Sequence, residues 1–196
     1  MIIKEKLKGE TEMATVRKYE SKDYENVQFV CLNSEGPATD PLETQEFVLI
    51  TFCKYYLEKE PENCFVLDDD GKAVGYVICA ENYDKFKEVF DAEYLTQTLK
   101  FPPHRYEWAS TAYLLQEKYK DSYPAHLHID VLPEYHRKGY GGKLINALFE
   151  HLRSKGINGV MLTVGAGNST GIGFYKKYGF ELLEQWEDDV AFGMKL

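Results

Sequence analysis

The stretch that most constrains the fold of this chain is residues 126–152, which read HLHIDVLPEYHRKGYGGKLINALFEHL. Polar and apolar residues alternate over 126–131, the pattern of a β-strand. Pro133 ends this strand because proline has no N–H to donate within a sheet. Leucines then recur at every fourth position over 144–152, as on the buried face of an amphipathic helix. The stretch therefore predicts a strand, a tight turn and a helix.

The turn between this strand and this helix has the features of an anion-binding site. Glycines at 139, 141 and 142 leave the backbone free of Cβ atoms, so that a ligand can approach it closely. The first N–H groups of a helix have no helical partner, and the helix dipole favours negative charge near them. Three cationic side chains add positive charge here: Arg137, Lys138 and Lys143.

The composition is that of a globular protein with an acidic balance. The chain has 196 residues, of which 44% are hydrophobic and 28% charged, and its formal net charge is −9. Such a charge disfavours nucleic acid or an anionic membrane as a partner. It suits a cationic substrate such as an amine, although many soluble proteins are also acidic. We find no membrane-spanning run or signal peptide, and four cysteines without a CxxC spacing, so we expect a cytoplasmic protein with reduced thiols.

The rest of the chain predicts one α/β domain. We expect a leader over residues 1–13, a single domain over 14–196, and a helical insertion over 81–124. The expected strands are 15–19, 64–67, 73–80, 125–131, 159–164, 180–186 and 190–196. The expected helices are 23–32, 40–59 and 169–178, with a further helix at 108–119 inside the insertion. Aromatic residues crowd the insertion, where they form either core or a helical lid, or else line a substrate pocket.

Two common nucleotide sites do not fit the sequence. A P-loop requires Ser or Thr after its Gly-Lys pair, and here Leu144 follows Lys143. The glycines at 165–171 follow a strand and open a helix, as in a dinucleotide fold. Too few residues follow them for the further βαβ units and the acidic residue that such a fold needs.

A third alternative accounts for both glycine-containing blocks. The spacing of Val131, His136, Gly139 and Gly141 resembles the pyrophosphate-binding motif of the GCN5-related N-acetyltransferase (GNAT) superfamily. His136 stands where that motif usually has Gln or Arg. The segment YPAHLHIDVLP before it resembles the acetyltransferase-like domains related to those fused to O-GlcNAc hydrolases.

The second block resembles the C-terminal signature of the same superfamily. It consists of Asn168, Tyr175 seven residues later, and a closing Gly179-Phe180 pair. The resemblance implies a GNAT fold: a central mixed, mostly antiparallel, twisted sheet of six to seven strands flanked by helices, with the helical insertion before the central strand.

The resemblance also implies acetyl-CoA as the cofactor. Its pyrophosphate would lie on the glycine turn, and its pantetheine arm would lie along the strand that ends at Val131. The expected cofactor-binding residues are Val131, Leu132, His136, Arg137, Lys138, Gly139, Tyr140, Gly141, Gly142, Lys143, Asn168, Gly171, Phe174 and Lys177.

Acetyl transfer to an amine requires a base and an acid. Tyr175 matches the usual acid of the family, and its alternative role is packing in the core. Asp130 and His128 are the expected candidates for the base, because they share one face of the central strand with His126. Each could equally be a satisfied structural group. We expect no metal, since the two histidines have no further ligands at zinc spacing.

The sequence thus predicts an acetyl-CoA-dependent N-acetyltransferase whose acceptor is a primary amine of a small molecule or a protein. The alternatives are a catalytically inactive CoA-binding sensor or scaffold, and an acyltransferase with a hydroxyl acceptor. The insertion over 81–124 is expected on the acceptor side. A homodimer is compatible with the sequence, which does not name the acceptor.

Overall fold

The structure is a computed structural model that describes residues 13–196, so the predicted leader lies outside the described residues except for Met13. Its centre is one seven-stranded sheet in the order β1-β2-β3-β4-β5-β7-β6. All neighbouring strands are antiparallel except β4 and β5, which are parallel. The predicted mixed, mostly antiparallel sheet is therefore confirmed. The strands are β1 (Thr15–Lys18), β2 (Phe65–Asp69), β3 (Lys72–Ala80), β4 (Ala125–Val131), β5 (Gly159–Gly165), β6 (Glu181–Gln185) and β7 (Asp189–Lys195).

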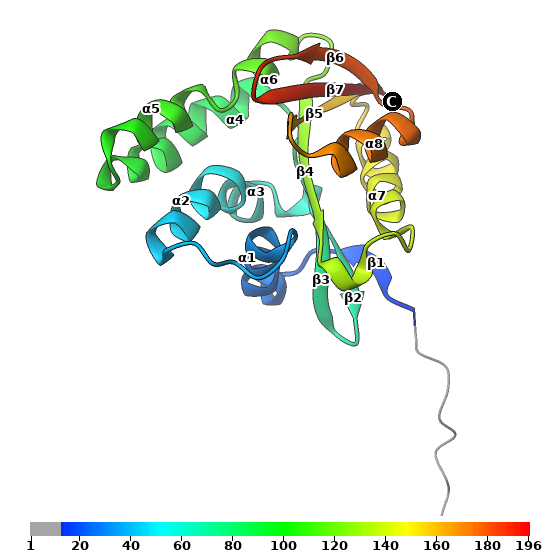
Figure 1. The fold of residues 1–196 in the computed structure, drawn as a ribbon. Coiled ribbons are helices and arrows are strands. Elements are labelled where there is room, and N and C mark those ends of the chain that lie inside the picture. Colours follow the sequence, from blue (N-terminus) through cyan, green and yellow to red (C-terminus); the bar gives the residue numbers. More distant parts are fainter. Residues whose placement is uncertain (1–12) are drawn as a thin grey trace, which may run out of the picture.

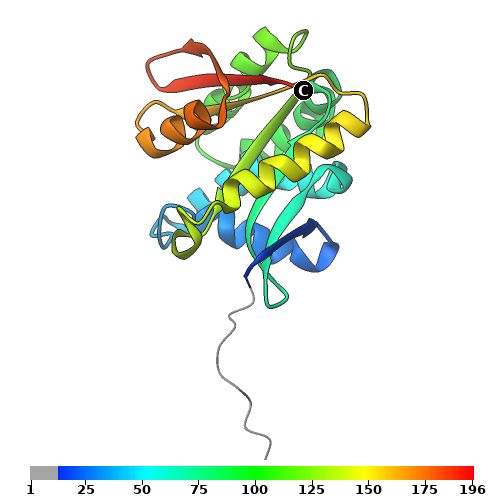
Figure 2. The same ribbon diagram turned by 90° about the vertical axis from the view of Figure 1, so that its right-hand side faces the viewer.

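Helices cover both faces of the sheet (Figure 1). The helices α1 to α5 lie on one side, and α7 and α8 lie on the other, where α7 crosses the sheet as a long diagonal (Figure 2). The helices are α1 (Tyr24–Asn33), α2 (Leu42–Phe52), α3 (Lys54–Lys59), α4 (Tyr83–Val89), α5 (Pro103–Thr111), α6 (Leu114–Tyr119), α7 (Tyr140–Ser154) and α8 (Ser169–Tyr178). Shorter helical turns are η1 (Ser21–Asp23), η2 (Pro61–Asn63), η3 (Phe90–Tyr94), η4 (Leu95–Lys100) and η5 (Pro133–Tyr135). Among residues 13–196, no helix is both long and apolar enough to cross a membrane.

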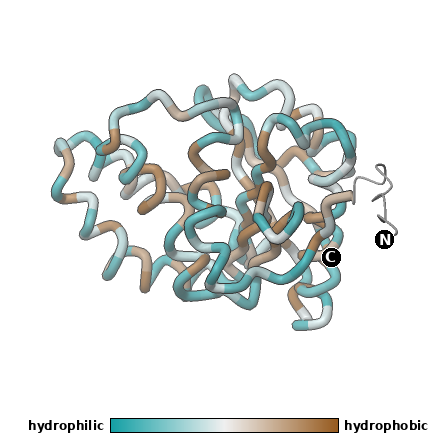
Figure 3. The backbone as a smooth tube through the Cα atoms, turned by 90° about the horizontal axis from the view of Figure 1, so that it is seen from below, coloured by the Kyte–Doolittle hydropathy of each residue, from teal (hydrophilic) through white to brown (hydrophobic). Residues whose placement is uncertain are grey.

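The core lies between the sheet and these two layers of helices. The predicted stripe of α7 is confirmed, because Leu144, Leu148 and Leu152 have no exposed surface. Burying a leucine side chain of this kind contributes about 1.5–3 kcal/mol. In Figure 3 the apolar stretches gather towards the strands and the inward turns of the helices. This packing holds the turn at the start of α7 against the end of β4.

The prediction of one helix over 40–59 is wrong in one respect, because this segment forms two helices that are separated at Cys53. The backbone of Cys53 leaves the helical region, with φ −127° and ψ −54°. Just before it, the carbonyl of Thr51 accepts a hydrogen bond of 2.6 Å from the hydroxyl of Tyr113. A side chain that hydrogen-bonds to a helical carbonyl from another element can interrupt a helix, and the helix breaks at this point.

The predicted helix over 108–119 is also wrong, because it is interrupted between α5 and α6. Tyr113 has φ −116° and ψ 19°, and its ring is buried at 3% exposure. Its ring centroid lies 4.7 Å from that of Phe86. Burial of this large aromatic ring stabilises the chain at the break.

Candidate functional site

Most of the predicted site residues meet in a cleft of about 1010 Å³ between the two central strands and the helices α7 and α8. Its polar and charged lining side chains are Ser34, Glu35, His128, Asp130, Tyr135, His136, Arg137, Tyr140, Thr163, Asn168, Thr170, Tyr175, Lys177 and Tyr178.

The cleft exists because β4 and β5 separate. These strands pair only at Ala125 with Val160 and at His126 with Met161. On its other edge, β4 stays paired with β3 as far as Val131, and β5 stays paired with β7 along its whole length. Beyond His126, the main-chain groups on the facing edges therefore have no strand partner, and an extended chain can bind between them.

The glycine turn closes one end of the cleft. Arg137 and Gly139 both have positive φ, at 59° and 81°, and helix α7 begins at Tyr140. The first N–H groups of this helix point out of its end without helical acceptors, which is the geometry of an anion site. The ring nitrogen Nε2 of His136 lies 2.6 Å from the carbonyl oxygen of Val131, so His136 ties the turn to the end of the strand.

Two further glycines allow α8 to approach α7 closely. A Cβ atom at Gly141 would lie 3.2 Å from Cζ of Phe174, and one at Gly142 would lie 3.5 Å from Cε2 of Tyr178. A larger residue at 141 would therefore push against the ring that lines the cleft. These contacts also place the second half of α8 beside the glycine turn.

Three of the predicted cofactor-binding residues lie outside the cleft lining. Leu132 is buried, and its N–H donates to the carbonyl of Val74. The ammonium groups of Lys138 and Lys143 lie over the rings of Tyr135 and Tyr140, at 5.5 and 5.2 Å. The structure brings the other predicted cofactor-binding residues together in the cleft.

The start of α8 reaches the opposite part of the cleft. The side-chain oxygen of Asn168 accepts a 2.8 Å hydrogen bond from the N–H of Gly171 and so caps the start of α8. Its Nδ2 donates over 3.4 Å to Glu35 in the loop between α1 and α2. Helix α8 therefore runs from Glu35 at one end of the cleft to the glycine turn at the other.

The positive and negative side chains of the lining are also separated along the cleft. Arg137 and Lys177 lie at the glycine turn, which we call the basic end of the cleft. Glu35 and Asp130 lie on the side of the loop between α1 and α2, where Ser34 donates to Asp130 and the charge of Glu35 acts on it, and we call this side the acidic end. These are the charged side chains of the lining if histidine is neutral.

Tyr175 projects from α8 into the cleft and is 8% exposed. Its ring packs against Phe180 and Phe192, at centroid distances of 5.5 and 5.7 Å. Burial, together with the nearby charge of Asp130, raises the pKa of the Tyr175 phenol above its usual value. The phenol therefore keeps its proton at neutral pH and can donate it to a stronger base.

The two histidines of β4 have different surroundings. His126 is fully buried and its Nε2 lies 3.0 Å from the hydroxyl of Tyr56, whereas His128 lines the cleft. Burial lowers the pKa of the His128 imidazole to about 4. His128 is therefore neutral at physiological pH and a weak base.

Asp130 is the stronger candidate for a base. It lines the cleft, and its carboxylate accepts a hydrogen bond from the Tyr76 hydroxyl. Burial raises the pKa of Asp130 to about 6, hydrogen bonds from Tyr76 and Ser34 act in the opposite direction, and the charge of Glu35 raises it further. Near neutral pH the carboxylate is ionised, yet it binds a proton more readily than an exposed aspartate does.

Most aromatic residues of the insertion belong to the core. Phe86, Phe90 and Tyr94 are at most 1% exposed. Trp108 differs, since it is 50% exposed and its ring lies 5.5 Å from that of Phe52. Phe52 in turn lies 5.5 Å from the ring of His128. One row of rings thus leads from α5 to the wall of the cleft.

Several lining residues were not predicted from the sequence. Ser34 and Glu35 come from a loop almost a hundred residues before the rest of the site, and Thr163 comes from the middle of β5. Thr163 accepts a 3.2 Å hydrogen bond from the buried amide of Gln116. No local pattern marks these residues, because only the packing of distant elements brings them to the cleft.

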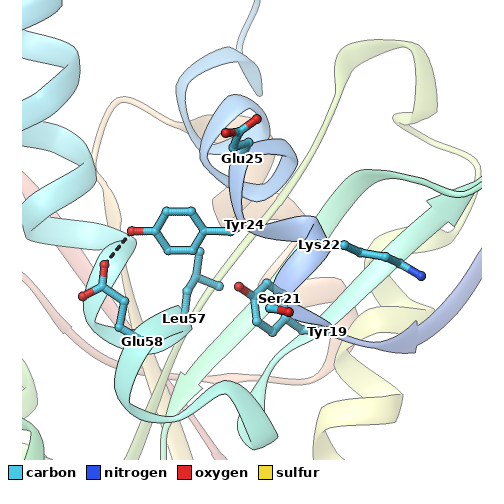
Figure 4. Close-up of a pocket in the computed structure, with 7 residues that line it drawn as sticks. All are labelled: Tyr19, Ser21, Lys22, Tyr24, Glu25, Leu57 and Glu58. Atoms are coloured by element: carbon cyan, nitrogen blue, oxygen red, sulfur yellow. Dashed lines mark hydrogen bonds between the residues drawn. The ribbon is translucent and has the colours of Figure 1, made fainter.

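A second hollow of about 540 Å³ lies between η1, the start of α1 and α3 (Figure 4). The hydroxyl of Tyr24 donates to Glu58 there, as the dashed line shows, and Tyr94 donates to the other oxygen of Glu58. Both oxygens of the Glu58 carboxylate already accept hydrogen bonds within the protein. This hollow is therefore a weaker candidate for a ligand site than the cleft. In the part of the chain that the structure describes, no three His, Cys, Asp or Glu side chains are grouped to hold a metal ion.

Comparison with known proteins points to one family. The family model described as Acetyltransferase (GNAT) family matches residues 24–180. A curated relative, an uncharacterized N-acetyltransferase of Methanocaldococcus jannaschii, is 27% identical over 130 residues. That match covers 66% of this chain and 44% of the relative, so the chain spans less than half the length of that protein.

Solved structures share the fold. The crystal structure of SsHAT has a TM-score of 0.82 and 27% identity, with 93% of this chain and 98% of that chain covered. The PaiA N-acetyltransferase of Thermoplasma acidophilum, solved in complex with coenzyme A, has a TM-score of 0.59 and 19% identity. Here too 93% of this chain and 98% of that chain are covered.

Proposed function

Because this chain belongs to the acetyltransferase (GNAT) family, we propose that it transfers an acetyl group from acetyl-CoA to a primary amine of a small molecule or a protein. Acetyl-CoA is the acetyl donor of this family and supplies a thioester whose carbonyl carbon the amine attacks directly. The observation that carries the proposal is the single cleft that joins an anion-binding helix start to a buried carboxylate and a buried phenol.

The residues of the cleft fit this donor. The N–H groups at the start of α7 and the side chains of Arg137 and Lys177 hold the pyrophosphate. The unpaired edge of β4 over 127–131 binds the amides of the pantetheine arm, since β5 has already separated from it. The thioester at the end of the arm would then lie near Asp130 and Tyr175, which both line the cleft.

Asp130 and Tyr175 move the two protons of the reaction. A free alkylammonium has a pKa near ~10, so a base must remove its proton before the nitrogen can attack. We assign this role to Asp130, because its pKa of about 6 makes it the better base than His128 at about 4. As the C–N bond forms and the C–S bond breaks, the phenol of Tyr175 gives its proton to the sulfur, and the second proton that the nitrogen loses as the amide forms restores the phenol.

The helical insertion covers the acceptor side in this proposal. The exposed ring of Trp108 and the ring of Phe52 lie in a row with His128, on the face of β4 that also carries Asp130. An acceptor that reaches Asp130 from this side passes these rings.

Two measurements test the proposal together. Calorimetry with acetyl-CoA measures binding, and a free-thiol assay measures turnover across panels of primary amines, lysine-containing peptides and alcohols. We expect binding together with thiol release for at least one amine. Binding without release on any acceptor would instead indicate a CoA-binding sensor, and release only with alcohols would indicate a hydroxyl acceptor.

A further inference from the structure

The loop between α1 and α2 places one carboxylate where the acceptor must arrive. The N–H of Gly36 donates to the carbonyl of Asn33 at 3.1 Å, and the N–H of Ala38 donates to the Asn33 side chain at 2.9 Å. These bonds fold the loop back on the end of α1. The loop then meets the start of α8 through the contact between Glu35 and Asn168, at 3.4 Å.

Glu35 lines the acidic end of the cleft without a cationic partner. Among residues 13–196, no Lys, Arg or His side chain forms an ion pair with it. The only side chain that donates to it within the described residues is the neutral amide of Asn168. Its side chain is exposed, so the carboxylate is free to bind a ligand.

Glu35 and Asp130 therefore face one space with two like charges. The cations of the lining, Arg137 and Lys177, lie at the basic end, beside the glycine turn. Two carboxylates that share a space repel each other, and a cation between them relieves that repulsion. The chemistry that best complements this end of the cleft is an ammonium ion without a nearby negative charge.

We propose that Glu35 is a specificity-determining residue, which binds the acceptor as its ammonium ion and selects amines that carry no carboxylate beside the reacting nitrogen. The proposal rests on the proposed function and names the acceptor class of the same site. Glu35 binds and orients the charged amine from the loop, and Asp130 removes the proton from the strand. An α-amino acid brings a third carboxylate into this space and is repelled.

Matched acceptor pairs test this selection directly. The pairs are 2-phenylethylamine with phenylalanine, and 3-methylbutylamine with leucine, because the members of each pair have one nitrogen and differ only by the carboxylate beside it. For the wild type we expect the plain amine to be preferred in kcat/KM. A charge-assisted hydrogen bond contributes a factor of roughly ten or more, so Glu35→Gln should raise the KM of the amines by about tenfold.

The other kinetic constants separate binding from structure. In Glu35→Gln, kcat and the KM for acetyl-CoA should stay within about twofold of wild type, and the preference for the plain amine should fall about tenfold. Glu35→Asp should retain part of the preference, and Glu35→Lys should reverse it. Glu43→Gln is the matched control, because Glu43 is an exposed carboxylate on α2 outside the cleft.

The outcomes are distinct. An unchanged preference in Glu35→Gln and Glu35→Lys, with an active wild type, would overturn the role of Glu35 and leave the proposed function intact. Equal use of amines and amino acids by the wild type would overturn the selection itself. Thiol release from no amine at all would overturn the proposed function, and this inference with it.

Discussion

The two ends of the cleft are built in different ways. The basic end comes from two continuous segments, a turn that opens α7 and the second half of α8, and it relies on backbone N–H groups and glycines. The acidic end is assembled from the loop that carries Glu35 and the face of β4 that carries Asp130. A site formed by backbone N–H groups suits a ligand that is always the same, such as a pyrophosphate. A site formed by side chains from separate elements can be altered by substitution to suit a different acceptor.

The largest expected effect is at the acidic end. Asp130→Asn removes the proposed base and keeps an oxygen for the Tyr76 hydroxyl, so kcat should fall by roughly 10²–10⁴-fold while the Kd for acetyl-CoA is unchanged. Steady-state kinetics and calorimetry measure the two quantities.

Stability provides the control for this variant. The folded state raises the pKa of Asp130 above its unfolded value, so ionisation costs stability as the pH rises from about 4 to 6. The Asn variant avoids that cost and should be no less stable than wild type at pH 8. A kcat within twofold of wild type would exclude Asp130 as the base.

Tyr175→Phe should have the next largest effect. Among the described residues, no hydrogen bond of the Tyr175 hydroxyl holds the fold together, so the variant removes mainly the proton that goes to the sulfur. We expect kcat to fall by about 10²-fold, the lower end of the range for a proton-transfer group, with acetyl-CoA affinity retained. Unchanged turnover would show that Tyr175 is not the acid and only packs in the core.

At the basic end, Gly139→Val tests whether an open backbone is needed. Gly139 has φ 81°, and Gly156, after the end of α7, has φ 75° with no role in the cleft. Valine at either position is strained by about 1–2 kcal/mol, so both variants should lose similar stability by thermal unfolding. Only Gly139→Val should also weaken acetyl-CoA binding, by about tenfold. Equal affinity in the two variants would argue against the turn as the pyrophosphate site.

The smallest expected effect lies at Asn168, at the start of α8. Asn168→Ala removes the cap of α8 and should cost about 1 kcal/mol, which lowers Tm by roughly 2–4 °C in a domain of this size. Ser169→Ala, one residue later and exposed, should leave Tm unchanged. A Tm equal to wild type in Asn168→Ala would show that the hydrogen bond to Gly171 is not a significant cap.

This contrast also explains what the sequence could and could not predict. The strand, the glycine turn, α7 and α8 are local features, so their periodicity and spacing were sufficient, and the structure confirms them. Glu35 could not be found, because nothing in its own loop shows that α8 lies against it. The breaks at Cys53 and Tyr113 were missed for a similar reason. Each depends on Tyr113, whose hydroxyl donates to the carbonyl of Thr51 in another part of the chain.

The pH dependence of kcat/KM for an amine acceptor, at saturating acetyl-CoA, tests the central claim most directly. If Asp130 accepts the proton of a bound ammonium ion, kcat/KM should rise to about pH 6, where Asp130 ionises. It should then stay level until the free amine loses its own proton near ~10. His128, with a pKa of about 4, should add no inflection in this range. A tenfold rise per pH unit from 6 to 9 would contradict the account, because it would show that the free amine is the form that binds and reacts.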